Sequence, residues 1–327
     1  MKPYTDIDTS KFYVIAVCSN PVRFNTRYRL FQQFQKHMKD VGAQLITVEQ
    51  AFGDRTYALT SRDNKFDLQF RTTSELWHKE NMINQAVQYL TQIDPDWKYV
   101  AWIDGDIHFQ RPDIIAETAH QLQHYDIVQM FSHVINMGPD LSPIEQHNGF
   151  MWSYIQNDCN PPKGVGENGY NVKTKSFWHP GYAWAATREA MDKLPLMDRA
   201  VLGSGDHHMA LGLIGCAKNS VPGAVTDAYS KYVLAWQDMA EHAIGRNVGY
   251  VPGMITHYWH GNKSNRKYQE RWSIVTKNNF DPYTDISRDG QGLYKLNPHN
   301  GKRYQRLRDE IRQYFRQRSE DSLDMLD

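Results

Sequence analysis

The sequence predicts an α/β fold in which a mainly parallel sheet is flanked by helices. Apolar runs of strand length, such as residues 11–20 and 43–50, alternate through the first half with segments whose apolar residues recur at helical spacing. This alternation is typical of parallel strands joined by helical crossovers. The chain has 327 residues, 40% of them apolar, which is enough for a large folded domain.

The elements of the first half follow one another closely. In chain order we expect a strand at 11–20, a helix with Phe31, Phe34, Met38 and Val41 on one face, a strand at 43–50, a helix with Leu76, Ile83, Val87 and Leu90 on one face, a strand in KYVAWIDGD (98–106), a short helix after Asp113 and a strand in YDIVQMF (125–131). Ligands of such sheets bind at the carboxyl ends of the strands.

The second half has a different character. Residues 132–180 are rich in Asn, Pro, Gly and Trp, which predicts long loops that shape a substrate pocket. Beyond them we expect a strand entering a helix at 181–194 with Thr187 as N-cap, a helix at 226–243, a short β segment at 253–261 and a mostly helical tail interrupted near 281–290. We divide the chain into a domain of residues 1–280 and a basic, mostly helical C-terminal extension of residues 281–327.

The net charge and the cysteine content restrict the partners and the cellular compartment that we expect. The formal net charge is zero, so nothing global demands a nucleic-acid or membrane partner. The three cysteines fit neither a zinc site nor a disulfide framework, which indicates a reducing compartment. Residues 1–20 lack a signal pattern and no apolar run reaches 18 residues, so we expect a cytoplasmic protein without membrane insertion.

The extension holds a basic run that allows two interpretations. It contains Lys302, Arg303, Arg306, Arg308, Arg312, Arg316 and Arg318, with Asp309 and Glu310 against them. The simpler interpretation is a solvated helix face. The alternative is a surface that contacts phosphates, for example those of DNA.

Two aspartates end the predicted strand at 98–106. Asp104 and Asp106 are one residue apart, and two carboxylates at a strand end can hold a divalent cation. Gly105 between them lets a ligand approach the backbone. Alone, the pattern is more typical of an acidic, solvated turn.

Two later segments add further candidates. In LGSGDHHMALGL (202–213) Asp206 caps a helix, serves as a general base that accepts a proton from a substrate hydroxyl, or does both. In GMITHYWHGNKSN (253–265) His257 would complete a mixed oxygen and nitrogen site that suits manganese. Lys263 and Arg266 follow it and would neutralise a diphosphate.

With these segments in order, the chain resembles metal-dependent glycosyltransferases of the GT-A fold, in particular the β-1,4-galactosyltransferase-like group. The likeness covers roughly residues 12–275 and is carried by VCSNPVRFN (17–25), WHKENMINQAV (77–87), WIDGDIHF (102–109) and GMITHYWHGNKSN (253–265). They are similar to the family's first-strand turn, the helix before its metal motif, its aspartate-x-aspartate motif and its Met-Ile-x-His segment.

The resemblance implies transfer of a sugar from a nucleotide-diphosphate donor, UDP favoured, to an acceptor hydroxyl with inversion, and a divalent Mn²⁺ or Mg²⁺ cofactor. Asp104, Asp106 and His257 are the implied metal ligands, with Asp104 alternatively on the ribose, and Asp206 is the base. The implied donor-binding residues are Asn20, Arg23, Lys79, Asp104, Tyr182, Trp184, Lys263 and Arg266. Tyr182 and Trp184 are equally typical of core residues.

The chain departs from the family in two respects. Its catalytic loop offers the single acid Asp206 where the family has consecutive acids, and it lacks the anchor and disulfides of secreted members. A bacterial, viral or phage enzyme in the (host) cytoplasm is therefore expected, acting on hydroxymethylated bases of phage DNA or on a surface glycan. The alternatives are a non-catalytic protein that binds carbohydrate or nucleotide sugar and, less favoured, a haloacid-dehalogenase-like phosphatase.

Overall fold

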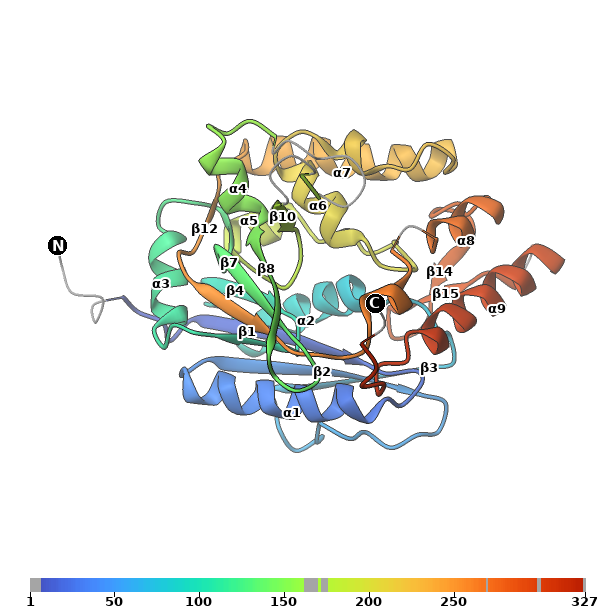
Figure 1. Cartoon of the computed structure of the whole chain (residues 1–327), viewed down its shortest axis with the longest axis horizontal. Coiled ribbons are helices and arrows are strands. Elements are labelled where there is room, and N and C mark those ends of the chain that lie inside the picture. Colours follow the sequence, from blue (N-terminus) through green and yellow to red (C-terminus); the bar gives the residue numbers. More distant parts are fainter. Residues whose placement is uncertain (1–6, 162–169, 172–175, 269, 299–300, 326–327) are drawn as a thin grey trace.

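A seven-stranded sheet forms the centre of the molecule (Figure 1). The computed structural model describes residues 7–161, 170–171, 176–268, 270–298 and 301–325. The strand order is β12 (Val248–Tyr250), β6 (Ile127–Gln129), β11 (Ala183–Thr187), β4 (Tyr99–Ile103), β1 (Phe12–Ser19), β2 (Gln44–Phe52) and β3 (Asp67–Thr72). Neighbouring strands are parallel except at β11, which is antiparallel to β4 and β6.

Helices cover both faces of this sheet, as the alternating pattern predicted. Along β1, Phe12, Val14 and Ala16 join one buried cluster and Tyr13 and Ile15 the other, because successive side chains of a strand point to opposite faces. The first cluster packs against α1 (Asn25–Asp40) and α3 (Ile114–Gln121), and the second against α2 (Lys79–Ile93), α6 (Gly205–Leu213) and α7 (Asp227–Ile244). The predicted α/β class is confirmed.

A second, six-stranded sheet lies beside the first. Its order is β5 (Ile107–Phe109), β13 (Met254–His257), β7 (His133–Met137), β8 (Pro143–Gly149), β10 (Ser176–His179) and β9 (Tyr170–Asn171). Residues 132–180 were expected to be long loops. For the described residues this prediction is wrong, because they supply β7, β8, α4 (Phe150–Gln156) and the strands β9 and β10; residues 162–169 and 172–175 lie outside the described residues. Four residues of β8 are exposed, so it lacks an apolar run, and its pairing with β7 defines it.

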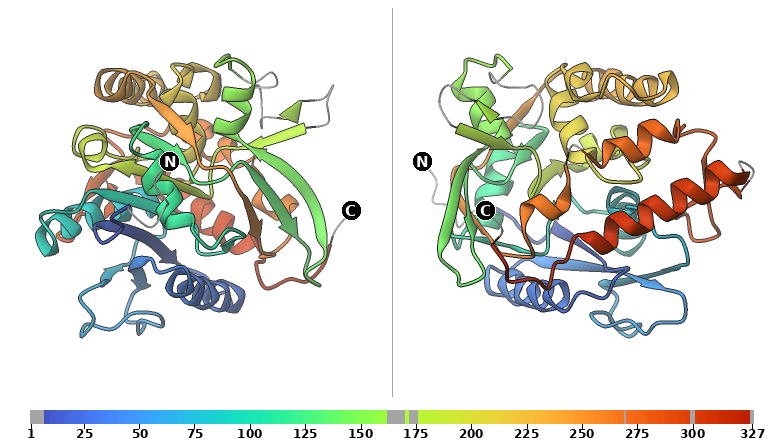
Figure 2. Two further views of the ribbon diagram at one scale, coloured as in Figure 1. Left: turned by 90° about the vertical axis from the view of Figure 1, so that its left-hand side faces the viewer. Right: turned by 45° about the vertical axis from the view of Figure 1, so that its right-hand side comes forward.

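The remaining elements follow the expected order. α5 (Arg188–Lys193) begins after Thr187, whose side chain accepts the Ala190 N–H as predicted. The chain then forms η3 (Ala217–Ser220), η4 (Lys263–Arg266), α8 (Trp272–Lys277), the hairpin of β14 (Ile286–Arg288) and β15 (Tyr294–Leu296), and α9 (Gly301–Gln317). After α9 the chain turns back toward β13 and the edge of the second sheet (Figure 2). Within the described residues, no helix combines the length and apolar character needed to cross a bilayer.

Register brings distant residues to the carboxyl edge of the central sheet. β1 and β4 run parallel, so the turn after Ser19 and the Asp104–Asp106 turn lie at one end. β13 pairs antiparallel with β5, which places His257 opposite Ile107, one residue past Asp106. The predicted gathering of strand ends therefore includes a strand of the second sheet.

The N-cap of α7 offers a test of this architecture. The Thr226 hydroxyl accepts the Tyr229 N–H and donates to the Phe280 carbonyl, so it joins α7 to the segment after α8. We expect Thr226→Ala to lower the free energy of unfolding by about 1 kcal/mol, the usual cost of losing a hydroxyl cap. Thr226→Ser keeps the hydroxyl and should stay close to wild type in urea denaturation; equal losses in both variants would contradict this role.

Candidate active site

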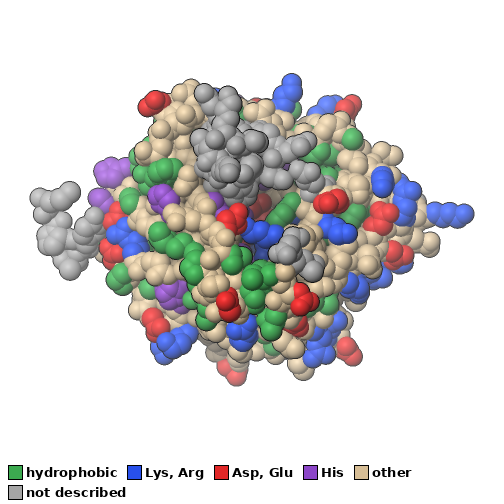
Figure 3. All heavy atoms as spheres, viewed as in Figure 1, with side chains coloured by type: hydrophobic (Ala, Val, Ile, Leu, Met, Phe, Trp, Pro, Cys, Tyr) green, Lys and Arg blue, Asp and Glu red, His purple; other side chains and the backbone are tan. Residues whose placement is uncertain are grey.

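One large cavity opens where these strand ends meet. Its volume is about 890 Å³, and its lining includes Asp104, Asp106, Asp206, His257 and Arg266 from segments far apart in the sequence. In the space-filling view, basic and acidic side chains lie side by side near the middle of this face (Figure 3). The carboxyl-end location matches the binding position expected for an open α/β sheet.

The two aspartates of the turn point to different partners. Asp104 forms an ion pair with Lys79 at the start of α2, and its N–H donates to the Tyr182 carbonyl at 2.8 Å. Asp106 instead faces the histidines of the β13 segment. A Cβ at Gly105 would lie 2.4 Å from the Phe31 ring, so only glycine lets the turn pack this closely on α1.

Asp106, His257 and His260 form a compact group. One ligand atom from each lies within 4.8 Å of the others. His260 Nε2 is 3.1 Å from Asp106 Oδ2 and 3.1 Å from His257 Nε2, and His257 Nε2 is 3.8 Å from Asp106 Oδ1. The three side chains thus direct oxygen and nitrogen atoms at one point.

Hydrogen bonding fixes the tautomer of His257. Asn136 on β7 donates through Nδ2 to Glu145, so its Oδ1 is the acceptor that faces His257 Nδ1 at 2.9 Å. His257 Nδ1 therefore carries the hydrogen, and Nε2 keeps a lone pair directed at Asp106. A metal-ligating histidine is normally oriented in this way by its second nitrogen.

The electrostatics of the group suit a cation. Burial and the Arg266 charge hold the pKa of His257 and His260 well below the usual value, so both rings stay neutral. Burial, with the nearby Asp104, raises the pKa of Asp106 to about 7. Among the described residues Asp106 Oδ1 is buried without a hydrogen-bond partner. Two neutral imidazoles and a carboxylate oxygen form a mixed nitrogen and oxygen set that a divalent transition-metal ion such as manganese can use.

The group differs from the predicted ligand set in one member. Asp104 was expected beside Asp106 and His257, but its carboxylate is engaged by Lys79, and His260 completes the group. His260 follows His257 by three residues in the same segment. That spacing was the available signal in the sequence.

Asp206 also lines the cavity. It is in the first turn of α6, whose N-cap residue is Ser204, so the alternative of Asp206 as the helix cap is wrong. Its Oδ1 accepts the His207 N–H, and a Cβ at Gly181 would lie 2.5 Å from its Oδ2. The absence of a side chain at Gly181 thus leaves room for the carboxylate.

A second acid, which the sequence analysis missed, lies close to Asp206. Glu80 is in the first turn of α2, is buried, and accepts a hydrogen bond from Trp77 Nε1 at 3.0 Å. A Cβ at Gly205 would be 3.3 Å from its Oε1. Since the loop around Asp206 has a single acid, Glu80 supplies the second carboxylate from another element.

The predicted donor-binding residues separate into two sets. Lys79, Asp104, Tyr182, Lys263 and Arg266 line the cavity. The other three, Asn20, Arg23 and Trp184, are not part of its lining.

Each of the three residues outside the lining has a different environment. Asn20 hydrogen-bonds the backbone of Phe24, Arg23 is exposed, and Trp184 is buried and donates to the Pro180 carbonyl. The arginine that does line the cavity from this region is Arg27 in α1, four residues after Arg23.

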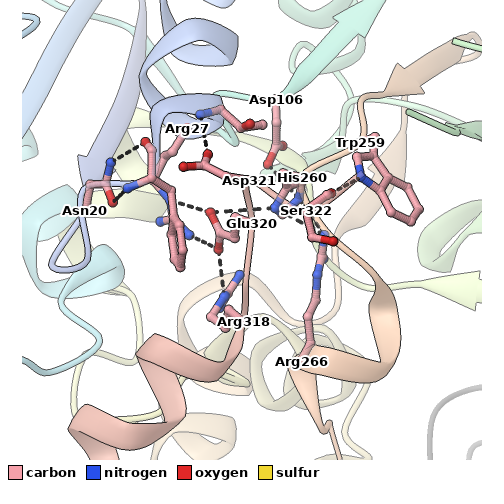
Figure 4. Close-up of polar contacts among 12 residues, drawn as sticks. Asn20, Arg27, Asp106, Trp259, His260, Arg266, Arg318, Glu320, Asp321 and Ser322 are labelled. Atoms are coloured by element: carbon pink, nitrogen blue, oxygen red, sulfur yellow. Dashed lines mark hydrogen bonds and ion pairs between the residues drawn. The ribbon is translucent and has the colours of Figure 1, made fainter. Parts of the chain in front are cut away.

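A buried ion cluster completes the wall near His260 (Figure 4). Glu320 pairs with Arg27 and Arg318, and these two cations hold the pKa of its carboxyl down at about 2 despite burial. Arg266 Nη2 is 2.6 Å from His260 Nε2 and Nη1 donates to the Tyr268 hydroxyl. No motif in the sequence indicated that Glu320 would reach this cavity.

Comparisons with known proteins reach only distant structures. No protein-family model matches the chain, and no curated protein does. The chain is similar to a Desulfovibrio desulfuricans protein assigned as a nucleotide-diphospho-sugar transferase, at 12% identity over 93% of this chain and 98% of that one, with a TM-score of 0.34. It is also similar to the catalytic domain of Drosophila β1,4-galactosyltransferase 7 in complex with xylobiose, at 10% identity, 89% and 96% coverage and a TM-score of 0.35.

A third similar structure is a glycosyltransferase involved in glycosylation of the major capsid of PBCV-1, at 8% identity over 75% of this chain and 91% of that one, with a TM-score of 0.28. At these TM-scores the likeness alone decides neither fold family nor activity. Both have to be argued from the motifs and the side chains of the cavity.

Glu80 makes the stability of the protein depend on pH. Burial raises its pKa from the ordinary 4.5 to about 7, with Lys79 opposing and Asp206 adding to the shift. The folded state therefore binds the proton more tightly, and stability falls as pH rises from about 4.5 to about 7. Glu80→Gln has no carboxyl group to ionise and therefore avoids this loss. In urea denaturation, the free energy of unfolding of the variant relative to wild type should rise by on the order of 2 kcal/mol between pH 5 and pH 8. An equal difference at both pH values would contradict the assignment.

Proposed function

We propose that the chain is a metal-dependent, inverting glycosyltransferase of the GT-A type. It would move a hexosyl or pentosyl group from a nucleoside-diphosphate sugar, with UDP favoured, to an acceptor hydroxyl. The observation that carries this proposal is the meeting of the Asp104–Asp106 turn, His257 and Asp206 in one cavity with several cations. The Asp104–Asp106 turn and His257 belong to segments that carry the family resemblance, and Asp206 belongs to the loop that corresponds to the family's catalytic loop.

Asp106, His257 and His260 would hold the divalent ion, Mn²⁺ or Mg²⁺. When bound, the ion supplies positive charge that offsets the charge of the leaving diphosphate. Asp104 lies on the other side of the turn, where Lys79 holds it. A ribose hydroxyl is therefore its preferred partner in our proposal.

Cationic side chains near this group would contact the phosphates. Arg266 lies against His260, and Lys263 pairs with Glu145 at the rim of the same cavity. Guanidinium groups suit phosphate oxygens because they offer a planar pair of donors. Charge already in place as the diphosphate leaves lowers the barrier without reorganisation.

Asp206 would serve as the base. In this role its carboxylate takes the proton of the acceptor hydroxyl while that oxygen forms a bond to the anomeric carbon and the bond to the diphosphate breaks. Attack from the face opposite the diphosphate inverts the anomeric centre. Glu80 is buried beside Asp206 and would hold a further group of the acceptor.

The acceptor is better described as a glycan than as DNA. The arginines of α9 that motivated a DNA surface form contacts within the chain, as in the ion pairs of Arg303 with Asp285 and of Arg316 with Glu75. Trp77, Trp272 and Phe315 also line the cavity, and apolar aromatic faces suit sugar rings. Cytoplasmic location remains a prediction.

The first test is a thermal-shift and calorimetric screen of nucleotide sugars with and without Mn²⁺. We expect binding of a UDP-sugar that requires the ion. His257→Ala should lose most of the Mn²⁺-dependent binding, and His124→Ala, on a surface segment outside the cavity lining, should not. Binding that ignores the ion, or no binding of any nucleotide, would refute the proposal.

The second test concerns Asp206. Asp206→Asn should lower the transfer rate by 10²–10⁴-fold, the usual contribution of a positioned base, while donor and Mn²⁺ binding stay near wild type. Asp227→Asn is a matched control, because Asp227 occupies the first turn of α7 but is exposed outside the cavity. Near-wild-type transfer in Asp206→Asn would exclude this base, and donor binding without any turnover in the wild type would favour a sugar-binding protein.

A further inference from the structure

We propose that the segment after α9, residues 318–322, is a working part of the metal site, with Glu320 as a positioning residue for His260. We call residues 318–322 the tail segment. The inference rests on the proposed function, because it assumes that His260 holds an ion. It assigns a role to the acid in an extension that the sequence marked mainly as basic.

Three contacts fix the tail segment in place (Figure 4). The carboxylate of Asp321 accepts the N–H groups of Asn25 and Thr26 at 3.0 and 2.7 Å, in the first turn of α1. Trp259 Nε1 donates to the Ser322 carbonyl at 2.8 Å. The tail segment therefore bridges α1 and the strand-end segment that carries the histidines.

Close packing at Gly261 shows that the tail segment is fitted to this place. Gly261 has a φ of 86°, and a Cβ there would lie 2.9 Å from the Ser319 carbonyl oxygen and 3.0 Å from Glu320 Cα. A larger residue would push the tail segment away from His260. Gly261 directly follows His260 in the chain, so the ring and the tail segment are positioned together.

Glu320 places a buried carboxylate of the tail segment near His260. Its side chain is only 1% exposed, it accepts from Arg27 and from Arg318 Nε at 2.7 Å, and its Oε2 is 4.0 Å from His260 Nδ1. Arg27 also donates to the Ser19 carbonyl at 2.7 Å, at the end of β1. The carboxylate is therefore held near His260 Nδ1, whereas Asp106 Oδ2 lies 3.1 Å from His260 Nε2.

The chemistry of a ligating imidazole explains why an acid is needed there. If His260 offers Nε2 to an ion, its Nδ1 carries the hydrogen and needs an acceptor. For His257 that acceptor is Asn136, at 2.9 Å. Near His260 Nδ1, Arg266 Nη2 at 3.3 Å can only donate, and Glu320 Oε2 is an acceptor. An acceptor carboxylate on the second nitrogen orients the ring and raises its basicity as a ligand.

Two other roles for Glu320 make different predictions. If it only neutralises Arg27 and Arg318, its removal changes stability and leaves Mn²⁺ affinity unchanged. If its carboxylate occupies the place of the donor diphosphate, its removal tightens nucleotide binding. The positioning role predicts weaker Mn²⁺ binding, so the sign of the change separates the three.

The experiment is calorimetric titration of the full chain with Mn²⁺ and then with UDP. We expect Glu320→Gln to weaken Mn²⁺ binding 10–100-fold, the usual effect of losing such an outer partner, and Glu320→Asp to recover part of it. Asp324→Asn is the matched control, since it removes the same charge from an exposed position four residues later and should bind Mn²⁺ like wild type.

A measurement on the unmutated chain guards against a misfolded variant. If the tail segment and the ion stabilise each other, saturating Mn²⁺ must slow amide hydrogen exchange in residues 319–322, because such coupling is reciprocal. Unchanged exchange there, or unchanged or tighter Mn²⁺ binding in a folded Glu320→Gln, overturns the inference alone. Failure of the wild-type chain to bind Mn²⁺ overturns the proposed function with it.

Discussion

A half-buried carboxylate with one buried, unpaired oxygen is the constraint on which the site depends. Asp106 lies in a wall where its Oδ1 has no hydrogen-bond partner among the described residues, and two neutral imidazoles face it. A buried acid without a partner is costly, and a folded protein keeps one when it is paired or binds a ligand. The surrounding structure holds this arrangement through Gly105, which packs on Phe31, and through the pairing of β13 with β5.

The charged side chains around this carboxylate are balanced in separate ion pairs. Lys79 forms an ion pair with Asp104, Lys263 forms one with Glu145, and Arg27 and Arg318 both pair with Glu320. Arg266 is the cation that instead lies against His260. Of the acids in these pairs Glu320 is buried, so the loss of Arg27 or Arg318 would leave its charge poorly compensated. A doubly charged ion and a diphosphate, arriving together, would add opposite charges at the centre of this arrangement.

The cavity is assembled from both sheets and from the end of the chain. The central sheet contributes the Asp104–Asp106 turn, the second sheet contributes His257 and its partner Asn136, and the tail segment contributes Glu320. Asp206 and Glu80 come from the starts of two helices on one face of the central sheet. The side chains that we propose for ion, donor and acceptor thus belong to different elements, each held by its own packing.

The sequence by itself determined the features that depend on local pattern. Alternating apolar runs predicted β1, β2 and β4 with their helices, and the acids at the end of β4 and the histidine of β13 were visible as motifs. Periodicity and turn residues are patterns of a few neighbouring positions, so they can be recognised in a single sequence. The sequence analysis did not predict β8, because its exposed residues form no apolar run.

Tertiary structure decided which of these residues meet. It placed Arg27 in the cavity and left Arg23 exposed, joined His260 to Asp106 while Lys79 engaged Asp104, and brought Glu80 to Asp206. These outcomes depend on helix rotation, strand register and the return of the chain after α9. Such relations arise from packing between distant segments, and the spacing of residues along a single sequence does not specify them.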